Sequence, residues 1–332
     1  MIIAAEEHYA TEEMGQNLKR WEREMGYQSV LSLEVEAERN RFIRAPFSEH
    51  RLPAMQRNGV TMQILSPQPP AAQALLDPIE ELIIAERYNQ QTQKLVQSDP
   101  SHFRGFAVLP MQTPMQAADA LERAVRTGFF VGAMIANNLN GRYLDDLVFE
   151  PLWDKLEALD VPLYIHVWNP SAVPGGVYEG APWLLGPTWN WATECATHAL
   201  RIIFSGVFDR HPGLKIMLGH LGEGLPFFAS RLDEGARLSG ASRMKHPPSY
   251  YLSRNFYVTT SGAFSGAALR CVMDTIGVDK VIFACDYPFS PMEDSMSCLD
   301  SCDLTAEERD AVCWGNALKL FHIDPATVAK SW

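Results

Sequence analysis

Eight short apolar runs recur along the chain, each of a length that suits one buried β-strand. Between them lie segments whose apolar residues repeat with helical spacing. The runs cover residues 2–8, 60–67, 103–110, 130–137, 161–167, 215–221, 256–262 and 281–288. The clearest helical segments cover residues 78–97, 117–128, 149–160 and 266–277. Strands and helices therefore alternate, which predicts parallel strands.

This alternation predicts an α/β fold, a (β/α)8 barrel of the TIM type with insertions at its rim. An open doubly wound sheet usually has a glycine-rich phosphate loop after its first strand, but no G-x-G-x-x-G follows residue 8. We expect one barrel domain over residues 1–332. A charged insertion at about 9–58 would supply rim helices or an oligomer contact, and a Pro/Gly-rich one at about 169–190 would cover the barrel mouth.

The charge, the apolar segments and the cysteines of the chain restrict its possible partners and its cellular compartment. The chain has 28 Lys+Arg against 40 Asp+Glu, and its net charge of −12 argues against nucleic acid or a membrane surface as a partner. We find no signal peptide pattern and no apolar segment long enough to span a membrane, so we expect a cytoplasmic protein. The six cysteines form no C-x-x-C pair, which favours free thiols over a zinc finger or a disulfide framework.

Polar residues with metal-binding chemistry fall at the carboxyl ends of the predicted strands, where barrels of this type place their functional groups. Glu6 and His8 end the first strand and point to the same face, because strand side chains alternate; Glu7 points away. His166, His220 and Asp286 end the fifth, sixth and eighth strands. Each of these residues alone is more often a capping or hydrogen-bonding group. Together they predict a divalent metal site.

Several local strings resemble the amidohydrolase superfamily in its metal-dependent decarboxylase branch. They are AAEEHYA (4–10), LDVPLYIHVWNP (159–170), GVFDRHPGLKIMLGHLGEGLPF (206–227) and VIFACDYPF (281–289). The branch includes gamma-resorcylate, carboxyvanillate and aminocarboxymuconate-semialdehyde decarboxylases, and the resemblance runs from end to end. It is closest to the hydroxybenzoate decarboxylases.

The resemblance implies a role for each residue of the site. Glu6, His8, His166 and Asp286 would bind the metal, and His220 with Glu223 would form a catalytic pair beside it. The chain has E-x-H where hydrolases of this superfamily have H-x-H, and its fourth run, FVGAMIAN, has no Lys to bridge two ions. We therefore expect one divalent ion, Zn²⁺ or Mn²⁺, in a mixed oxygen and nitrogen shell.

An ortho-hydroxybenzoate could present its phenolate and carboxylate oxygens to such an ion. Loss of carbon dioxide from an aromatic ring first requires a proton on the carbon that bears the carboxyl group. We hypothesise that Asp286 delivers this proton. Glu223 would orient the His220 imidazole, although GEGLP could also make Glu223 a helix-capping residue.

The substrate, a small aromatic carboxylic acid, needs apolar walls and a cation. Trp168, Trp189 and Trp191 after the fifth strand are candidates for the walls, together with Tyr9, although tryptophan is also common in cores and interfaces. Arg231 would meet the substrate carboxylate by the resemblance, unless it forms a surface ion pair. Arg51 would reach a neighbouring subunit's site, since related enzymes are commonly homodimers or homotetramers.

Two other functions remain open at this point. The same ion could activate a water, which would make the protein a hydrolase or hydratase of a lactone, enol acid or amide. A barrel that has lost its chemistry could also serve only in binding or assembly, but the presence of a residue at every ligand position argues against this. The sequence favours the lyase.

Overall fold

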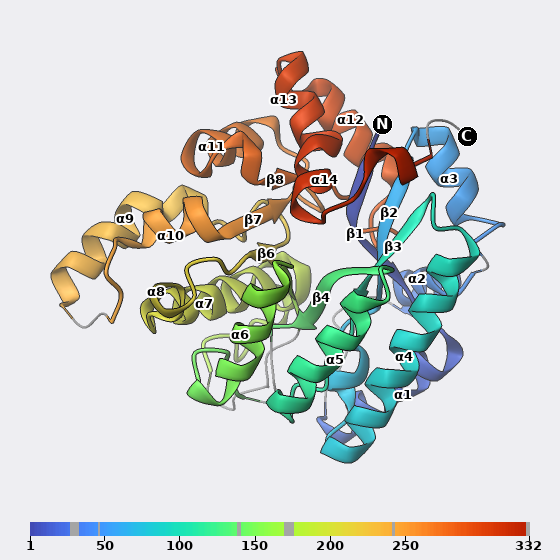
Figure 1. Ribbon diagram of the computed structural model, residues 1–332, viewed down its shortest axis with the longest axis horizontal. Coiled ribbons are helices and arrows are strands. Elements are labelled where there is room, and N and C mark those ends of the chain that lie inside the picture. The colour runs from blue at the N-terminus through green and yellow to red at the C-terminus, as the bar shows by residue number, and fades with distance from the viewer. Residues whose placement is uncertain (27–32, 46, 138–140, 169–175, 241–242, 330–332) are drawn as a thin grey trace.

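The computed structural model describes residues 1–26, 33–45, 47–137, 141–168, 176–240 and 243–329, and its centre is an eight-stranded parallel sheet (Figure 1). Neighbours in the sheet follow the chain order from β1 to β8. The strands are β1 (Ile3–Tyr9), β2 (Met62–Pro67), β3 (Phe103–Ala107), β4 (Phe130–Ala136), β5 (Leu163–His166), β6 (Ile216–Leu218), β7 (Phe256–Thr259) and β8 (Val281–Ile282). Each lies within or beside a predicted run, so the predicted parallel strands are confirmed.

The sheet closes on itself between its first and last strands. Just beyond β8, the carbonyl of Phe283 accepts a hydrogen bond of 3.0 Å from the Ala5 amide, and that of Tyr287 accepts one of 2.7 Å from the His8 amide. Glu7 and Tyr287 form a parallel bridge there. The (β/α)8 barrel is therefore confirmed, and its closure lies next to the first metal-ligand candidates.

Helices surround the barrel and account for the helical periodicity of the sequence (Figure 1). The helices are α1 (Glu12–Glu24), α2 (Leu33–Ile43), α3 (Arg51–Asn58), α4 (Pro78–Ser98), α5 (Pro114–Arg126), α6 (Glu150–Leu159), α7 (Asn190–Phe204), α8 (Val207–Arg210), α9 (Leu225–Ser239), α10 (Pro248–Asn255), α11 (Gly266–Ile276), α12 (Met292–Ser301), α13 (Ala306–Asp310) and α14 (Asn316–Leu320). Shorter helical turns are Ala71–Ala74, Leu147–Phe149, Pro182–Leu184, Gly186–Thr188, Val278–Lys280, Ala311–Gly315 and Pro325–Thr327. The four predicted helices correspond to α4, α5, α6 and α11.

Two apolar layers stabilise the barrel. The outer layer packs strand residues such as Leu65 and Ile135 against helix residues such as Tyr88 and Trp153. The inner layer includes Ile3, Ala5, Ile64 and Phe106, with Phe321 from the segment after α14 packed on Phe106 at a centroid distance of 5.8 Å. The barrel is thus filled at the level of these residues, which leaves the carboxyl ends of the strands for function.

A bulge in β1 turns its polar residues toward the barrel axis. Ala4 pairs with Gln63 and Glu7 with Leu65, so three steps along β1 face two along β2. The extra residue moves the inward face from Ile3 and Ala5 to the ligand candidates after them.

The first expected insertion is helical. Residues 9–58 contain the end of β1 and helices α1, α2 and α3. Of the second, residues 169–175 lie outside the described residues, and the rest includes the turns Pro182–Leu184 and Gly186–Thr188. Among the helices described, none is long and apolar enough to cross a membrane.

Candidate metal centre

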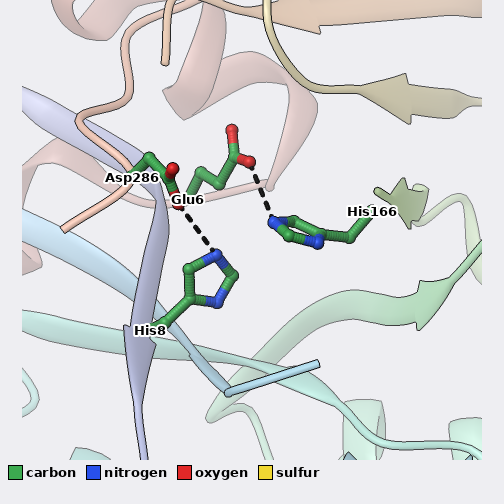
Figure 2. Close-up of side chains that lie close together, drawn as sticks. All are labelled: Glu6, His8, His166 and Asp286. Carbon is green, nitrogen blue, oxygen red and sulfur yellow. Dashed lines mark ion pairs between the residues drawn. The ribbon is translucent and has the colours of Figure 1, made fainter. Parts of the chain in front are cut away.

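Four side chains from distant parts of the chain meet at the carboxyl ends of the strands (Figure 2). Glu6 and His8 extend from β1, His166 ends β5 and Asp286 follows β8. One ligand atom from each lies within 4.8 Å of the others. His166 Nε2 is 3.2 Å from Glu6 Oε1, and His8 Nε2 is 3.3 Å from Asp286 Oδ1. The structure thus brings together the four predicted ligands.

The four atoms fit a divalent cation. Glu6 Oε1, His8 Nε2, His166 Nε2 and Asp286 Oδ1 are buried and have no hydrogen-bond partner among the residues that the structure describes. Leaving one such atom unpaired costs about 1–3 kcal/mol, so four at one point indicate a shared partner. Two carboxylates and two imidazoles suit Zn²⁺ or Mn²⁺ and also leave coordination positions for a substrate.

The second nitrogen of each histidine fixes which nitrogen faces the metal position. His8 Nδ1 lies 2.9 Å from Ser66 Oγ, and His166 Nδ1 lies 2.7 Å from the Val167 carbonyl, which only accepts. Nδ1 of His166 therefore carries the hydrogen, and its Nε2 has a free lone pair. Burial lowers the pKa of His8, which keeps that imidazole neutral and able to bind a metal.

Glu6 is held in its ionised form. Its Oε2 accepts hydrogen bonds from Ser261 Oγ and, at 2.7 Å, from Thr259 Oγ1. Burial alone would raise the pKa of the carboxyl, but the imidazoles of His166, His220 and His8, when they carry a second proton, outweigh burial and hold this pKa well below its usual value. A carboxylate that stays charged in a buried site requires positive charge beside it.

His220 and Glu223 form a pair next to these four residues. His220 Nδ1 is 2.8 Å from Glu223 Oε1, and the His220 ring lies 6.5 Å from the ring of His166. Burial works against the charged imidazole, but the Glu223 carboxylate outweighs it and raises the pKa of His220 to about 10. Both residues have positive φ, 49° and 55°, which is uncommon for residues other than glycine. This conformation bends the segment after β6 toward the cavity.

A cavity of about 400 Å³ opens onto the site and has room for a small aromatic acid. It is lined by His166, His220 and Asp286 and by the aromatic rings of Trp168, Trp191 and Phe289. Trp168 and Trp191 are therefore placed as the sequence analysis expected. Trp189 is 53% exposed and lies outside this lining.

Three other expected substrate contacts lie away from the cavity. Tyr9 is buried on the outer face of β1, where its hydroxyl lies 2.7 Å from Thr92 Oγ1. Arg51 is 3% exposed and donates to the carbonyl of His8 within its own chain, so it is not available to a neighbouring subunit. Arg231 is exposed on α9 and does not line the cavity. For Tyr9 and Arg51, burial contradicts the expected contact.

Three cavity residues from the first insertion were not expected from the sequence. Arg39 of α2 lines the cavity, with its Cζ 5.3 Å from the centre of the Phe289 ring. Burial lowers the pKa of its guanidinium, and the Asp286 carboxylate partly offsets this effect. Glu22 of α1 and Glu36 of α2 also line it. Burial and the charge of Glu36 raise the pKa of Glu22. The charge-rich composition of residues 9–58 was the only signal, and it did not single out these three.

Comparison with known proteins extends over nearly the whole chain. A family model described as amidohydrolase matches residues 42–323. Gamma-resorcylate decarboxylase of Polaromonas sp. is 36% identical over 336 residues, which cover 97% of this chain and 98% of that protein.

Two solved structures have the same fold over the same extent. One is 2,6-dihydroxybenzoate decarboxylase complexed with 2,6-dihydroxybenzoate, with a TM-score of 0.88, 33% identity, and coverage of 97% of this chain and 99% of that one. The other is a dihydroxybenzoic acid decarboxylase from Polaromonas sp. with bound manganese and the inhibitor 2-nitroresorcinol. Its TM-score is 0.87 and its identity 36%, with coverage of 97% and 96%.

Proposed function

Since this chain belongs to the amidohydrolase family, in its branch of metal-dependent decarboxylases, we propose that it catalyses the nonoxidative decarboxylation of a hydroxylated aromatic acid such as a hydroxybenzoate. One observation carries the proposal: four ligand atoms without a hydrogen-bond partner among the described residues meet beside a cavity with aromatic walls, and two of their residues, His166 and Asp286, line that cavity. The cavity of about 400 Å³ suits a single ring with its substituents.

Glu6, His8, His166 and Asp286 would hold one divalent cation. When bound, the cation supplies electrostatic stabilisation for negative charge on the carboxylate and phenolate oxygens of the substrate. We favour manganese over zinc, because half of the ligands are carboxylates and a similar decarboxylase contains manganese. Metal analysis of the purified protein, followed by reconstitution of the metal-free form with each ion, tests this choice.

The chain's own residues would position the ring and move one proton. Trp168, Trp191 and Phe289 confine the ring, and the Arg39 guanidinium can pair with a carboxylate oxygen. Asp286, which would hold a proton when displaced from or weakly bound to the metal, donates this proton to the carbon that bears the carboxyl group and later regains one from solvent. The bond between the ring and the carboxyl carbon then breaks, its electron pair returns to the ring, and carbon dioxide leaves. Glu223 keeps the His220 imidazole positively charged beside the ring of the substrate.

The experiment is turnover of a panel of hydroxybenzoates by the manganese-loaded protein, with carbon dioxide release and lactone or amide hydrolysis followed separately. Decarboxylation in D₂O should place one deuterium on the ring carbon that lost the carboxyl group. Asp286→Asn should abolish turnover. If this variant still binds the ion and decarboxylates at the wild-type rate, Asp286 is not the donor. Hydrolysis without decarboxylation would instead favour the hydrolase.

We further propose that the protein assembles as a homodimer or homotetramer through the exposed face of α9. Phe227 is 74% exposed there and Leu238 69%, which is unusual for large apolar side chains. Arg231 lies on the same helix, so its expected contact with the substrate would have to be made in a partner's cavity. Sedimentation velocity tests the assembly, and Phe227→Asp should shift it toward monomer.

We place the protein in the cytoplasm, because its six cysteines are free and three of them, Cys195, Cys285 and Cys313, are buried thiols. Localisation of a tagged full-length chain in its cell of origin tests this.

A further inference from the structure

A buried polar network lies directly behind the metal centre, on the outer face of β1. Glu7 and Gln63 are fully buried and Arg51 is 3% exposed. Gln63 Nε2 donates to Glu7 Oε2 at 3.0 Å, and Arg51 Nη1 donates to Gln63 Oε1 at 2.8 Å. The Gln63 amide therefore lies between a carboxylate and a guanidinium, and each of its polar ends faces the matching partner.

The two ends of this network are attached to two ligand-bearing segments. Glu7 Oε1 accepts a hydrogen bond of 2.9 Å from the backbone amide of Cys285, the residue before Asp286. Arg51 Nη2 donates to the backbone carbonyl of His8. The network therefore connects the end of β1 to the segment that follows β8.

The segment after β8 needs such support. β8 itself has only two residues, Val281 and Ile282, and Asp286 lies four residues beyond it. Asp286 also has a φ of 61°, which disfavours a non-glycine residue by about 1–2 kcal/mol. A short strand and an unfavourable backbone conformation cannot by themselves fix a side chain to the precision that a metal requires.

The guanidinium is also fixed from the sides. Arg51 Cζ lies 4.7 Å from the centre of the Phe47 ring and 4.8 Å from that of Tyr287, the residue after Asp286. Arg51 thus contacts both the residue that carries one ligand and the neighbour of another.

We propose that Glu7, Gln63 and Arg51 are positioning residues of the metal centre, which hold His8 and Asp286 at metal-binding distance through the backbone at His8 and Cys285. The proposal goes beyond the proposed reaction and does not depend on it, since it concerns the affinity for the ion and not the chemistry that follows. Groups that support metal ligands in this way typically change affinity by about 10–100-fold when removed.

The test measures Mn²⁺ affinity of the metal-stripped full-length protein from the electron paramagnetic resonance signal of free aqueous Mn²⁺, together with thermal unfolding. Glu7→Gln should weaken Mn²⁺ binding by about 10–100-fold. This variant leaves the Arg51 guanidinium buried and could fail to fold for that reason. The double variant Glu7→Gln/Arg51→Met removes both ionisable groups and should show the same loss of affinity.

Glu81→Gln is the matched control. Glu81 is 1% exposed and accepts hydrogen bonds of 3.0 Å from the amides of Met111 and Gln112, but none of these residues lines the metal cavity. This variant should lose stability and keep the wild-type Mn²⁺ affinity. Unchanged affinity in the Glu7 variants, or an equal loss in Glu81→Gln, overturns the proposal. A wild-type protein that binds no Mn²⁺ or Zn²⁺ overturns the metal centre itself, whereas absence of decarboxylation with normal Mn²⁺ binding affects only the proposed function.

Discussion

Removal of the metal should lower the thermal stability of this protein by an amount that can be estimated. Within the described part of the chain the four proposed ligand atoms have no other partner, so we expect the cation to bind the folded chain and to find no comparable site in the unfolded one. At a free concentration of about 1,000 times Kd, such a ligand stabilises the fold by about 4.1 kcal/mol. An unfolding entropy of about 2.1 cal/mol/K per residue gives about 0.7 kcal/mol/K for 332 residues. The expected rise in Tm is therefore about 6 °C.

The assay is circular dichroism melting of the metal-stripped protein at increasing MnCl₂ concentration. His166→Ala removes one of the four ligands and should weaken binding by at least about 100-fold. The same MnCl₂ concentration then stabilises the fold by about 1.4 kcal/mol, which corresponds to a shift of about 2 °C.

His198→Ala provides the control. His198 is buried, as His166 is, but its Nε2 accepts a hydrogen bond of 2.9 Å from the Leu144 amide and its Nδ1 lies 2.7 Å from the Asn137 carbonyl. This variant should melt at a lower temperature without metal and keep the full shift with MnCl₂. An equal shift in His166→Ala and wild type would refute the assignment of the ligands, and so would a lost shift in His198→Ala.

Three further predictions concern the cavity. Arg39→Ala should raise KM for the aromatic acid by about tenfold or more, because it removes one charge-assisted hydrogen bond to the substrate. Arg44→Ala, which removes a cation paired with Glu12, should leave KM unchanged, and steady-state kinetics distinguish the two variants. Trp191→Ala should also raise KM while Mn²⁺ affinity stays unchanged, because the side chain is a wall and not a ligand. In the metal-free protein, His220 has a pKa of about 10 beside Glu223, so the stability from this pair is complete below about pH 6.5 and is lost as the pH rises through 10. Urea unfolding between pH 7 and 11 should show a loss of stability in wild type that is smaller in Glu223→Gln.

The fold could be predicted from the sequence because its elements differ sharply in apolar period. The predicted helix at 78–97 is observed at Pro78–Ser98, and the one at 266–277 at Gly266–Ile276. Several strands end earlier than their apolar runs, among them β6 at Leu218 and β8 at Ile282. His220 and Asp286 consequently lie in loops, where their positive φ could not be read from composition.

The errors at the site have two causes. Tyr9 was expected to contact the substrate, yet strand alternation already places it on the face opposite His8, so the rule applied to Glu6 and Glu7 would have excluded it. Arg51 was different. Its burial depends on Gln63 and on the rings of Phe47 and Tyr287, contacts that no local pattern reveals.

Different parts of the chain supply the proposed metal ligands and the residues that line the rest of the cavity. Strands β1 and β5 and the loop after β8 supply the proposed metal ligands, which other members of the family could use for different chemistry. The first insertion supplies Glu22, Glu36 and Arg39 to the cavity, so we expect this segment to distinguish one aromatic acid from another. Burial, and then the charge of Glu36, raise the pKa of Glu22, so this part of the wall disfavours a further negative charge. A ring substituent that donates a hydrogen bond, such as a hydroxyl or an amino group, therefore fits this wall better than a further carboxylate does.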